Sequence, residues 1–116
     1  MNYNIIATEN FQSEVKRLLK KYASLANELK SLENLILVQP TMGTPIGHNA
    51  YKIRLAVKSK GKGKSGGLRL ISYLELNYII NDLTDIFLLT IYDKSETESI
   101  NKKEIARLIK LRKKLK

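Results

Sequence analysis

The first forty residues carry apolar side chains at helical spacing, separated by charged ones. After a short apolar segment, Tyr3–Ala7, a break near Ala23 and Ser24 divides the pattern into two series. The first series is Phe11, Val15, Leu18, Leu19 and Tyr22, and the second is Leu25, Leu29, Leu32 and Ile36. The pattern predicts two amphipathic helices packed as a hairpin.

The middle of the chain changes from helical to strand periodicity. From Val38 to Asn49 the helical pattern is lost, and two prolines and two glycines predict a loop. From Tyr51 to Lys58 apolar residues alternate with mainly cationic ones, which predicts a half-buried strand. The sequence KSKGKGKSGG follows, and its four glycines predict a mobile hairpin tip that leads into a second strand over Leu68–Leu76.

The C-terminal third combines a buried strand with a capped helix. After the turn NDLTD, the residues from Ile86 to Tyr92 are apolar on both faces, which predicts the central strand of the sheet. Asn101, with Glu104 three residues later, is a helix-capping pattern, and it lies between Ile100 and Ile105 in the positions of a hydrophobic staple. The elements predict an α+β fold that forms one domain over residues 1–116.

The charge of the chain points to a polyanionic partner. The 116 residues include 21 Lys and Arg against 11 Asp and Glu, a net charge of +10, and nucleic acid is the leading partner class. No apolar run approaches the roughly 20 residues that span a bilayer, and the N-terminal sequence does not resemble a secretory signal. We therefore expect no membrane partner and a cytoplasmic location. The lack of cysteine excludes disulfides, thiolate zinc sites and a thiol nucleophile.

A series of cations follows the first predicted strand. Its members all have even numbers, so an extended backbone would direct them to one side of the sheet. They are Lys52, Arg54, Lys58, Lys60, Lys62 and Lys64. Phosphates are their natural ligand, although lysines at a sheet edge can also serve to prevent edge-to-edge pairing.

Four residues, one of them Arg54 of this series, are considered for RNA chemistry. Arg54 and Arg69 stand on predicted strands, where a guanidinium can hold a phosphate bidentately, or can form a structural ion pair. Tyr92 ends the buried strand and could stack on a base or move a proton, with nearby cations lowering its pKa, or could pack in the core. His48 could be a general base, but it lies in a loop where nothing nearby in the sequence fixes its position, and we expect it to have no catalytic role. The carboxylates show no metal-ligand spacing, so we expect no metal and no cofactor.

The run KIRLAVKSKGKGKSGGLRLISY, followed by DIFLLTIYDKSETESINKKEI, resembles the core of the RelE/ParE superfamily, most closely its HigB-like RelE branch. The resemblance implies two N-terminal helices packed on a twisted, mainly antiparallel four-stranded sheet, with a C-terminal helix. It also implies the toxin of a type II toxin-antitoxin system, a metal-independent endoribonuclease that cleaves mRNA in the ribosomal A site. The partners would be mRNA on the ribosome, rRNA, and a cognate antitoxin, often a helix-turn-helix protein.

The resemblance also implies which residues form the site. The positions that match the basic cluster and tyrosine of RelE-like toxins are Arg54, Lys62, Lys64, Arg69, Tyr92 and Lys94, which would be catalytic. Lys52, Lys58 and Lys60 would bind RNA. The chain lacks the C-terminal histidines of some relatives, so the proton-transfer roles stay open. Two alternatives also stay open: a ParE-like inhibitor of DNA gyrase, and an RNA-binding module without catalysis.

Overall fold

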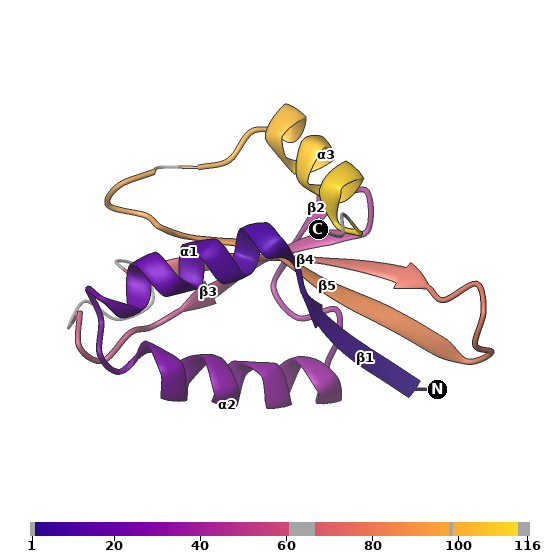
Figure 1. The fold of residues 1–116 in the computed structure, drawn as a ribbon, viewed down its shortest axis with the longest axis horizontal. Helices are drawn as coiled ribbons and strands as arrows, with labels where there is room; N and C mark the ends of the chain where they lie inside the picture. Colours follow the sequence, from indigo (N-terminus) through magenta and orange to yellow (C-terminus); the bar gives the residue numbers. More distant parts are fainter. Residues whose placement is uncertain (1, 61–66, 98, 114–116) are drawn as a thin grey trace.

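The computed structural model describes residues 2–60, 67–97 and 99–113, and it shows three helices and one five-stranded sheet (Figure 1). In chain order the elements are β1 (Asn2–Ala7), α1 (Glu9–Leu19), α2 (Leu25–Val38), β2 (Thr44–Gly47), β3 (Ala50–Leu55), β4 (Leu68–Leu76), β5 (Leu83–Asp93) and α3 (Lys102–Leu111). The strand order is β1-β5-β4-β3-β2, with β1 parallel to β5 and the other three pairings antiparallel. The α+β class and the mainly antiparallel sheet are confirmed, but the predicted count of four strands is wrong.

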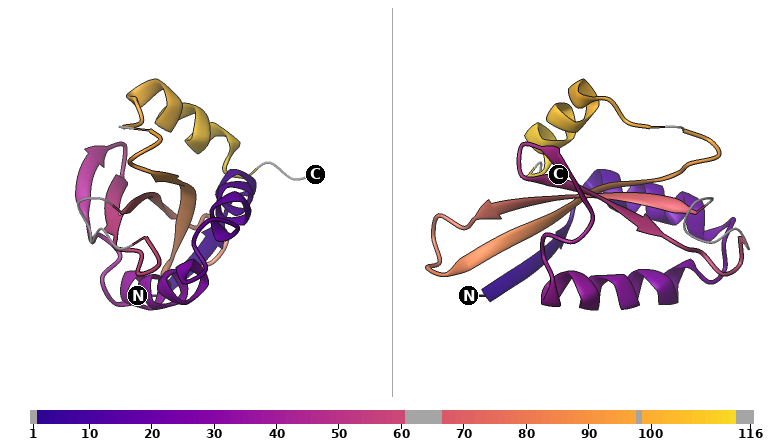
Figure 2. Two further views of the ribbon diagram at one scale, coloured as in Figure 1. Left: turned by 90° about the vertical axis from the view of Figure 1, so that its left-hand side faces the viewer. Right: turned by 180° about the vertical axis from the view of Figure 1, so that it is seen from behind.

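The helices cover both faces of the sheet (Figure 2). The predicted helical pair is confirmed as α1 and α2, whose apolar side chains form one core with residues of β3, β4 and β5. On the other face, Ile105 and Leu108 of α3 pack with Ile71 and Phe87. The expected cap of α3 is also confirmed, because the Asn101 side chain accepts a hydrogen bond from the backbone N–H of Glu104 at 2.8 Å.

Strand β5 is an interior strand buried on both faces, but the prediction that it is the central strand is wrong, because β4 occupies the middle of the strand order and only β1 lies beyond β5. Leu88 belongs to the core beneath α1 and α2, and Leu89 to the core beneath α3. Both side chains are fully buried. The register between β4 and β5 shifts at Ile71 and Ser72, where β5 has one extra residue.

The sequence pattern predicts no strand for β1, described only as a short apolar segment, or for β2, in the segment predicted to be a loop. Strand β2 pairs with β3 at the sheet edge, where Pro45 needs no ladder partner for its missing N–H. Gly43 precedes it with a φ of +98°, and a Cβ at this position would lie 2.5 Å from the Lys52 carbonyl oxygen. The four residues of β2 have the composition of a loop. The strand forms because it pairs with β3, and this tertiary contact leaves no local pattern in the sequence.

Strand β3 is shorter than its alternating pattern predicts. It ends at Leu55, and turns follow at residues 58–60. The predicted hairpin tip falls largely on residues 61–66, which lie outside the described residues. No helix within the described residues is long and apolar enough to cross a membrane.

Candidate nucleic-acid interface

Three of the predicted site residues form one row across neighbouring strands. In the register, Arg54 of β3 lies opposite Arg69 of β4, and Arg69 lies opposite Tyr92 of β5. Residues that lie opposite one another in a sheet point to the same face, and adjacent strands are about 4.8 Å apart. The face is the one on which α3 packs, because Tyr92 belongs to the α3-side core. The sheet therefore gathers residues that are up to 38 positions apart in the sequence.

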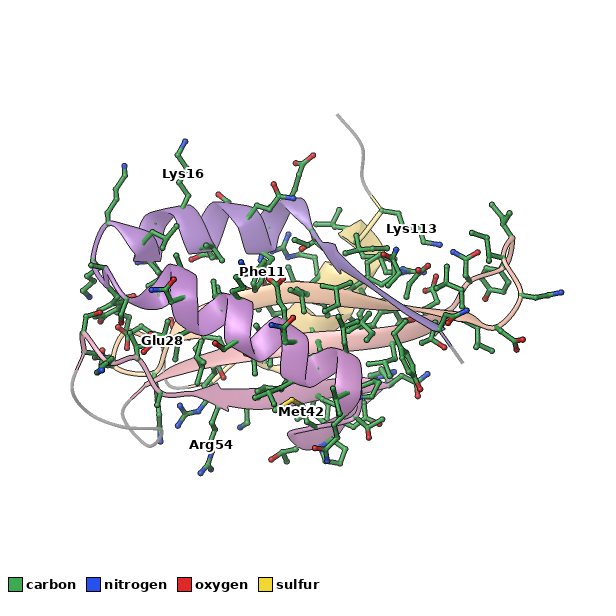
Figure 3. All side chains as sticks on the ribbon, turned by 90° about the horizontal axis from the view of Figure 1, so that it is seen from below. Phe11, Lys16, Glu28, Met42, Arg54 and Lys113 are labelled. Carbon is green, nitrogen blue, oxygen red and sulfur yellow. The ribbon has the colours of Figure 1, made fainter. Side chains whose placement is uncertain are left out.

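The three residues differ in their access to solvent. Arg54 is exposed, and Figure 3 shows its side chain projecting from β3 away from the body of the molecule. Arg69 and Tyr92 are 3% and 6% exposed. The Arg69 guanidinium donates through Nη1 to the carbonyl of Leu68 at 3.2 Å. Arg54 is thus the cation of the row that a ligand in solution can reach directly.

Tyr92 is a neutral phenol at physiological pH. Burial raises the pKa of Tyr92 above its ordinary value, and the charge of Arg69 offsets only part of this effect. The expectation that cationic neighbours lower its pKa is therefore wrong, because the buried position of the ring outweighs them. A neutral Tyr92 can stack on a base or donate a hydrogen bond.

A cavity of about 390 Å³ lies beside the row. Its walls are largely apolar, contributed by Ile46 of β2, Ile71 of β4, Ile100 just before α3 and Ile105 in α3. Tyr92, Lys52, Ser99 and Lys102 also line it. Lys52 lies opposite Ile71, two residues along the strands from the Arg54–Arg69 pair and therefore on the same face. The cavity thus combines an aromatic ring and apolar walls with two lysines.

Lys102 is a lining residue that sequence reasoning missed. It is the first residue of α3, directly after the capping Asn101. The sequence signal that could have identified Lys102 was its place at the N-terminus of a helix, since that helix packs on the cationic face of the sheet. The segment between β5 and α3 brings Lys102 to the cavity beside Tyr92. No local sequence pattern shows that the chain returns to this face of the sheet.

Lys60 does not extend the cationic row. Its side chain is 8% exposed, and its ammonium donates to Asp93 Oδ1 and Oδ2 at 2.9 and 3.1 Å. It also donates to the Tyr22 hydroxyl at 3.2 Å. The expectation of one extended row from Lys52 to Lys64 is therefore wrong at Lys60, because β3 has ended and the chain turns toward the end of β5.

Asp93 is the centre of this buried cluster. It is fully buried, and it accepts hydrogen bonds from Tyr22, from Lys60, and from the backbone N–H and hydroxyl of Ser95. Burial alone would raise the pKa of the Asp93 carboxyl, but hydrogen bonds from Tyr22, Ser95 and Lys60 hold it well below its usual range. The cluster ties the end of β5, and with it Tyr92 and Lys94, to the connection between α1 and α2, which carries Tyr22, and to the turn after β3.

The other predicted cations have different surroundings. Lys58 is exposed in the turn after β3, and its backbone N–H donates to Glu28 at 2.6 Å. Lys94 is exposed next to Asp93, and its N–H donates to the carbonyl of Gly67 at 3.4 Å. Lys62 and Lys64 lie outside the described residues.

His48 lies away from the row. It is exposed in the turn between β2 and β3, with a φ of 56°. Within β3, the extended chain from Ala50 to Arg54 alone spans about 13 Å. Across residues 2–60, 67–97 and 99–113, no three His, Cys, Asp or Glu side chains group as metal ligands.

The geometry describes a small α+β protein whose mainly antiparallel sheet carries a row of arginines and a tyrosine on one face. No protein-family profile matches the chain. The structure is similar to that of a double arginine-to-alanine mutant of the E. coli toxin RelE in the free state, with a TM-score of 0.54 and 17% sequence identity. The match covers 97% of this chain and 95% of that chain. The chain has a RelE-like toxin fold, as the resemblance implied.

Proposed function

We propose that this protein is the toxin of a type II toxin-antitoxin system and cleaves mRNA on the ribosome. The observation that carries the proposal is the row of Arg54, Arg69 and Tyr92 on one face of a RelE-like sheet. The net charge of +10 suits RNA as a substrate and an acidic surface on a cognate antitoxin, such as a helix-turn-helix protein. Such a toxin would act in the cytoplasm, where mRNA and rRNA meet in the ribosome.

The proposed reaction is attack of a ribose 2′-oxygen on the adjacent phosphate. The 2′-hydroxyl loses its proton to a base, the new O–P bond forms, and the bond to the 5′-oxygen breaks as that oxygen takes up a proton. The products are a 2′,3′-cyclic phosphate and a 5′-hydroxyl end. Catalysis then requires alignment, charge stabilisation at phosphorus and two proton transfers, which side chains can supply without a metal.

The residues divide between these tasks. Arg54 holds the scissile phosphate, since a guanidinium group binds phosphate oxygens bidentately, and the buried Arg69 opposite it adds positive charge from within the sheet. Tyr92 positions a base by stacking. The lysines of the proposed site, Lys62, Lys64 and Lys94, are the candidates for proton transfer, while Lys52 and Lys58 bind neighbouring phosphates.

The test is to map mRNA 5′ ends by primer extension after brief induction, with translation allowed or blocked. The variant is Arg54→Ala, because Arg54 is exposed and its removal leaves the core intact. Lys16→Ala is the matched control, since Figure 3 shows Lys16 projecting from α1 on the far side of the molecule from Arg54. We expect new ends that require translation, persist in Lys16→Ala and are strongly reduced in Arg54→Ala.

Other outcomes would replace the proposal. Growth arrest without new ends, together with altered DNA supercoiling, would indicate a gyrase inhibitor. RNA binding by the purified protein without new ends or altered supercoiling would indicate a binding module.

A further inference from the structure

A second polar site lies at the other end of β4 and β5, where two carboxylates face each other. Glu75 and Asp85 are directly opposite in the register, and they are 9% and 5% exposed. Like charges at directly opposite positions destabilise a sheet, and buried carboxylates need partners. The site therefore requires compensation by cations or hydrogen-bond donors.

The compensation that the described residues provide is uneven. Arg112 and Lys113, after the end of α3, both form ion pairs with Glu75, the second at 2.9 Å. Asp85 accepts a hydrogen bond on Oδ2 from the Asn77 amide at 3.0 Å. Its other oxygen, Oδ1, is buried without a hydrogen-bond partner in the described part of the chain. Asp85 thus retains a strong acceptor that a donor from outside could use.

This carboxylate lines a cavity of about 490 Å³ between β1, the start of α1, β5 and the end of α3. Ile6 and Phe87 give it apolar walls, and the exposed Glu9 adds a second carboxylate. Arg112 and Lys113 also line it; both form ion pairs with Glu75, although the buried Nε of Arg112 has no hydrogen-bond partner in the described part of the chain. The cavity thus offers carboxylates beside an apolar wall.

We propose that this cavity binds a primary ammonium or guanidinium group carried on an apolar stem. The ammonium would donate to Asp85 Oδ1 while the stem contacts Ile6 and Phe87. A divalent metal suits the cavity poorly, because it requires about six oxygen ligands. The ligand is either a free diamine or the side chain of a lysine or arginine from a partner protein. The inference goes beyond the proposed function and does not depend on it.

The experiment titrates the whole protein with 1,4-diaminobutane and, separately, with a lysine blocked as an amide at both ends, following backbone amides by NMR. We expect saturable shifts around Asn77, Asp85 and Phe87 with at least one probe. Saturation by the diamine identifies a free amine as the source, and saturation by the blocked lysine alone identifies a protein side chain. Asp85→Asn should weaken binding about ten-fold or more, since one charge-assisted hydrogen bond is lost.

Asp82→Asn is the matched control, because Asp82 is exposed in the turn before β5 and its φ of 59° is one that asparagine tolerates. This variant should bind as the wild type does. Ile6→Phe reduces the cavity while it keeps Asp85, and it should also weaken binding. Absence of saturation with both probes, or equal binding by the Asp85→Asn and Asp82→Asn variants, would overturn the proposal. RNA cleavage should be unchanged in Asp85→Asn, which separates this test from that of the proposed function.

Discussion

Arg69 and Tyr92 lie directly opposite each other on β4 and β5, and both are buried on the face of the sheet where α3 packs. The pair places a fixed cation beside a phenol that remains protonated at neutral pH, because burial raises the pKa of Tyr92 more than Arg69 lowers it. A buried phenol of this kind is poorly suited to serve as a base. Its ring and its hydroxyl hydrogen remain as the means by which it can contribute.

Tyr92→Phe and Tyr92→Ala should therefore have very different effects on RNA cleavage. We expect a mild loss for Tyr92→Phe, because the ring is retained. For Tyr92→Ala we expect a loss of about 10- to 100-fold, since stacking on a base is worth about 1 to 3 kcal/mol. The measurement is the single-turnover cleavage rate with saturating ribosome complexes.

Because Tyr92 is buried, each rate is divided by the folded fraction of the variant, obtained from circular dichroism. Truncation of a buried aromatic ring costs about 3 to 5 kcal/mol of stability, so this correction is necessary. Equal and large losses in both variants would show that the phenol's proton matters instead of its ring.

The salt dependence of RNA binding should separate Arg54 from Lys60. Arg54 is exposed and would contact a phosphate, so Arg54→Ala should flatten the slope of log K against log salt by about 0.7. Lys60 is turned inward to Asp93, so Lys60→Met should leave the slope unchanged. The measurement is fluorescence anisotropy of a labelled single-stranded RNA over a range of salt concentrations.

Lys58→Ala is the matched control for Lys60→Met, since Lys58 is exposed two positions earlier on the same turn. A slope that flattens in Lys60→Met as much as in Lys58→Ala would show that Lys60 leaves Asp93 to bind RNA.

The contrast between Arg54 and Lys60 shows what the sequence could predict of the site. Alternation correctly assigned Lys52 and Arg54 to one face of a strand, because period-two patterning is a local property of extended backbone. It failed at Lys60, since the partner that captures the ammonium, Asp93, is 33 positions away. The neutral state of Tyr92 likewise depends on burial that distant residues supply.

The fold divides in the same way into elements that local sequence patterns predict and elements that depend on distant contacts. The helices α1 and α2, the capped α3 and the apolar β5 were predictable, because each has a strong periodic or capping signal. The edge strand β2 was not, because Pro45 and the glycines around it are typical of loops, and its hydrogen bonds are made with β3. The cavity beside Asp85 was also hidden, since it joins segments from both ends of the chain.

Gly43→Ala should destabilise the protein by about 2 to 4 kcal/mol, from backbone strain at positive φ together with a steric clash. The added Cβ would lie 2.5 Å from the Lys52 carbonyl oxygen, so β2 would have to move away from β3. The measurement is the free energy of unfolding in urea.

Gly47→Ala is the matched control for the clash. Gly47 also has a positive φ, +92°, but a Cβ there would have no heavy atom within 4 Å. Its cost should therefore be limited to the strain, about 1 to 2 kcal/mol. Equal costs for the two variants would mean that β2 is not held against β3 at Gly43.

Asp93→Asn should destabilise the protein by about 3 to 5 kcal/mol at neutral pH, because it leaves the Lys60 ammonium buried without its counter-charge. The folded-state pKa of Asp93 lies below its unfolded value, so its stabilising contribution is present above about pH 4 and is lost as the pH falls below that. The free energy of unfolding of the wild type should thus fall more steeply than that of Asp93→Asn between about pH 5 and pH 2. Urea unfolding at a series of pH values measures the free energy of unfolding of the wild type and of Asp93→Asn.

Glu104→Gln is the control for Asp93→Asn, since Glu104 pairs with Arg107 at an exposed position and should contribute less than about 1 kcal/mol. Parallel pH curves for the wild type and Asp93→Asn would mean that the Tyr22–Lys60–Asp93 cluster does not stabilise the folded state through the charge of Asp93.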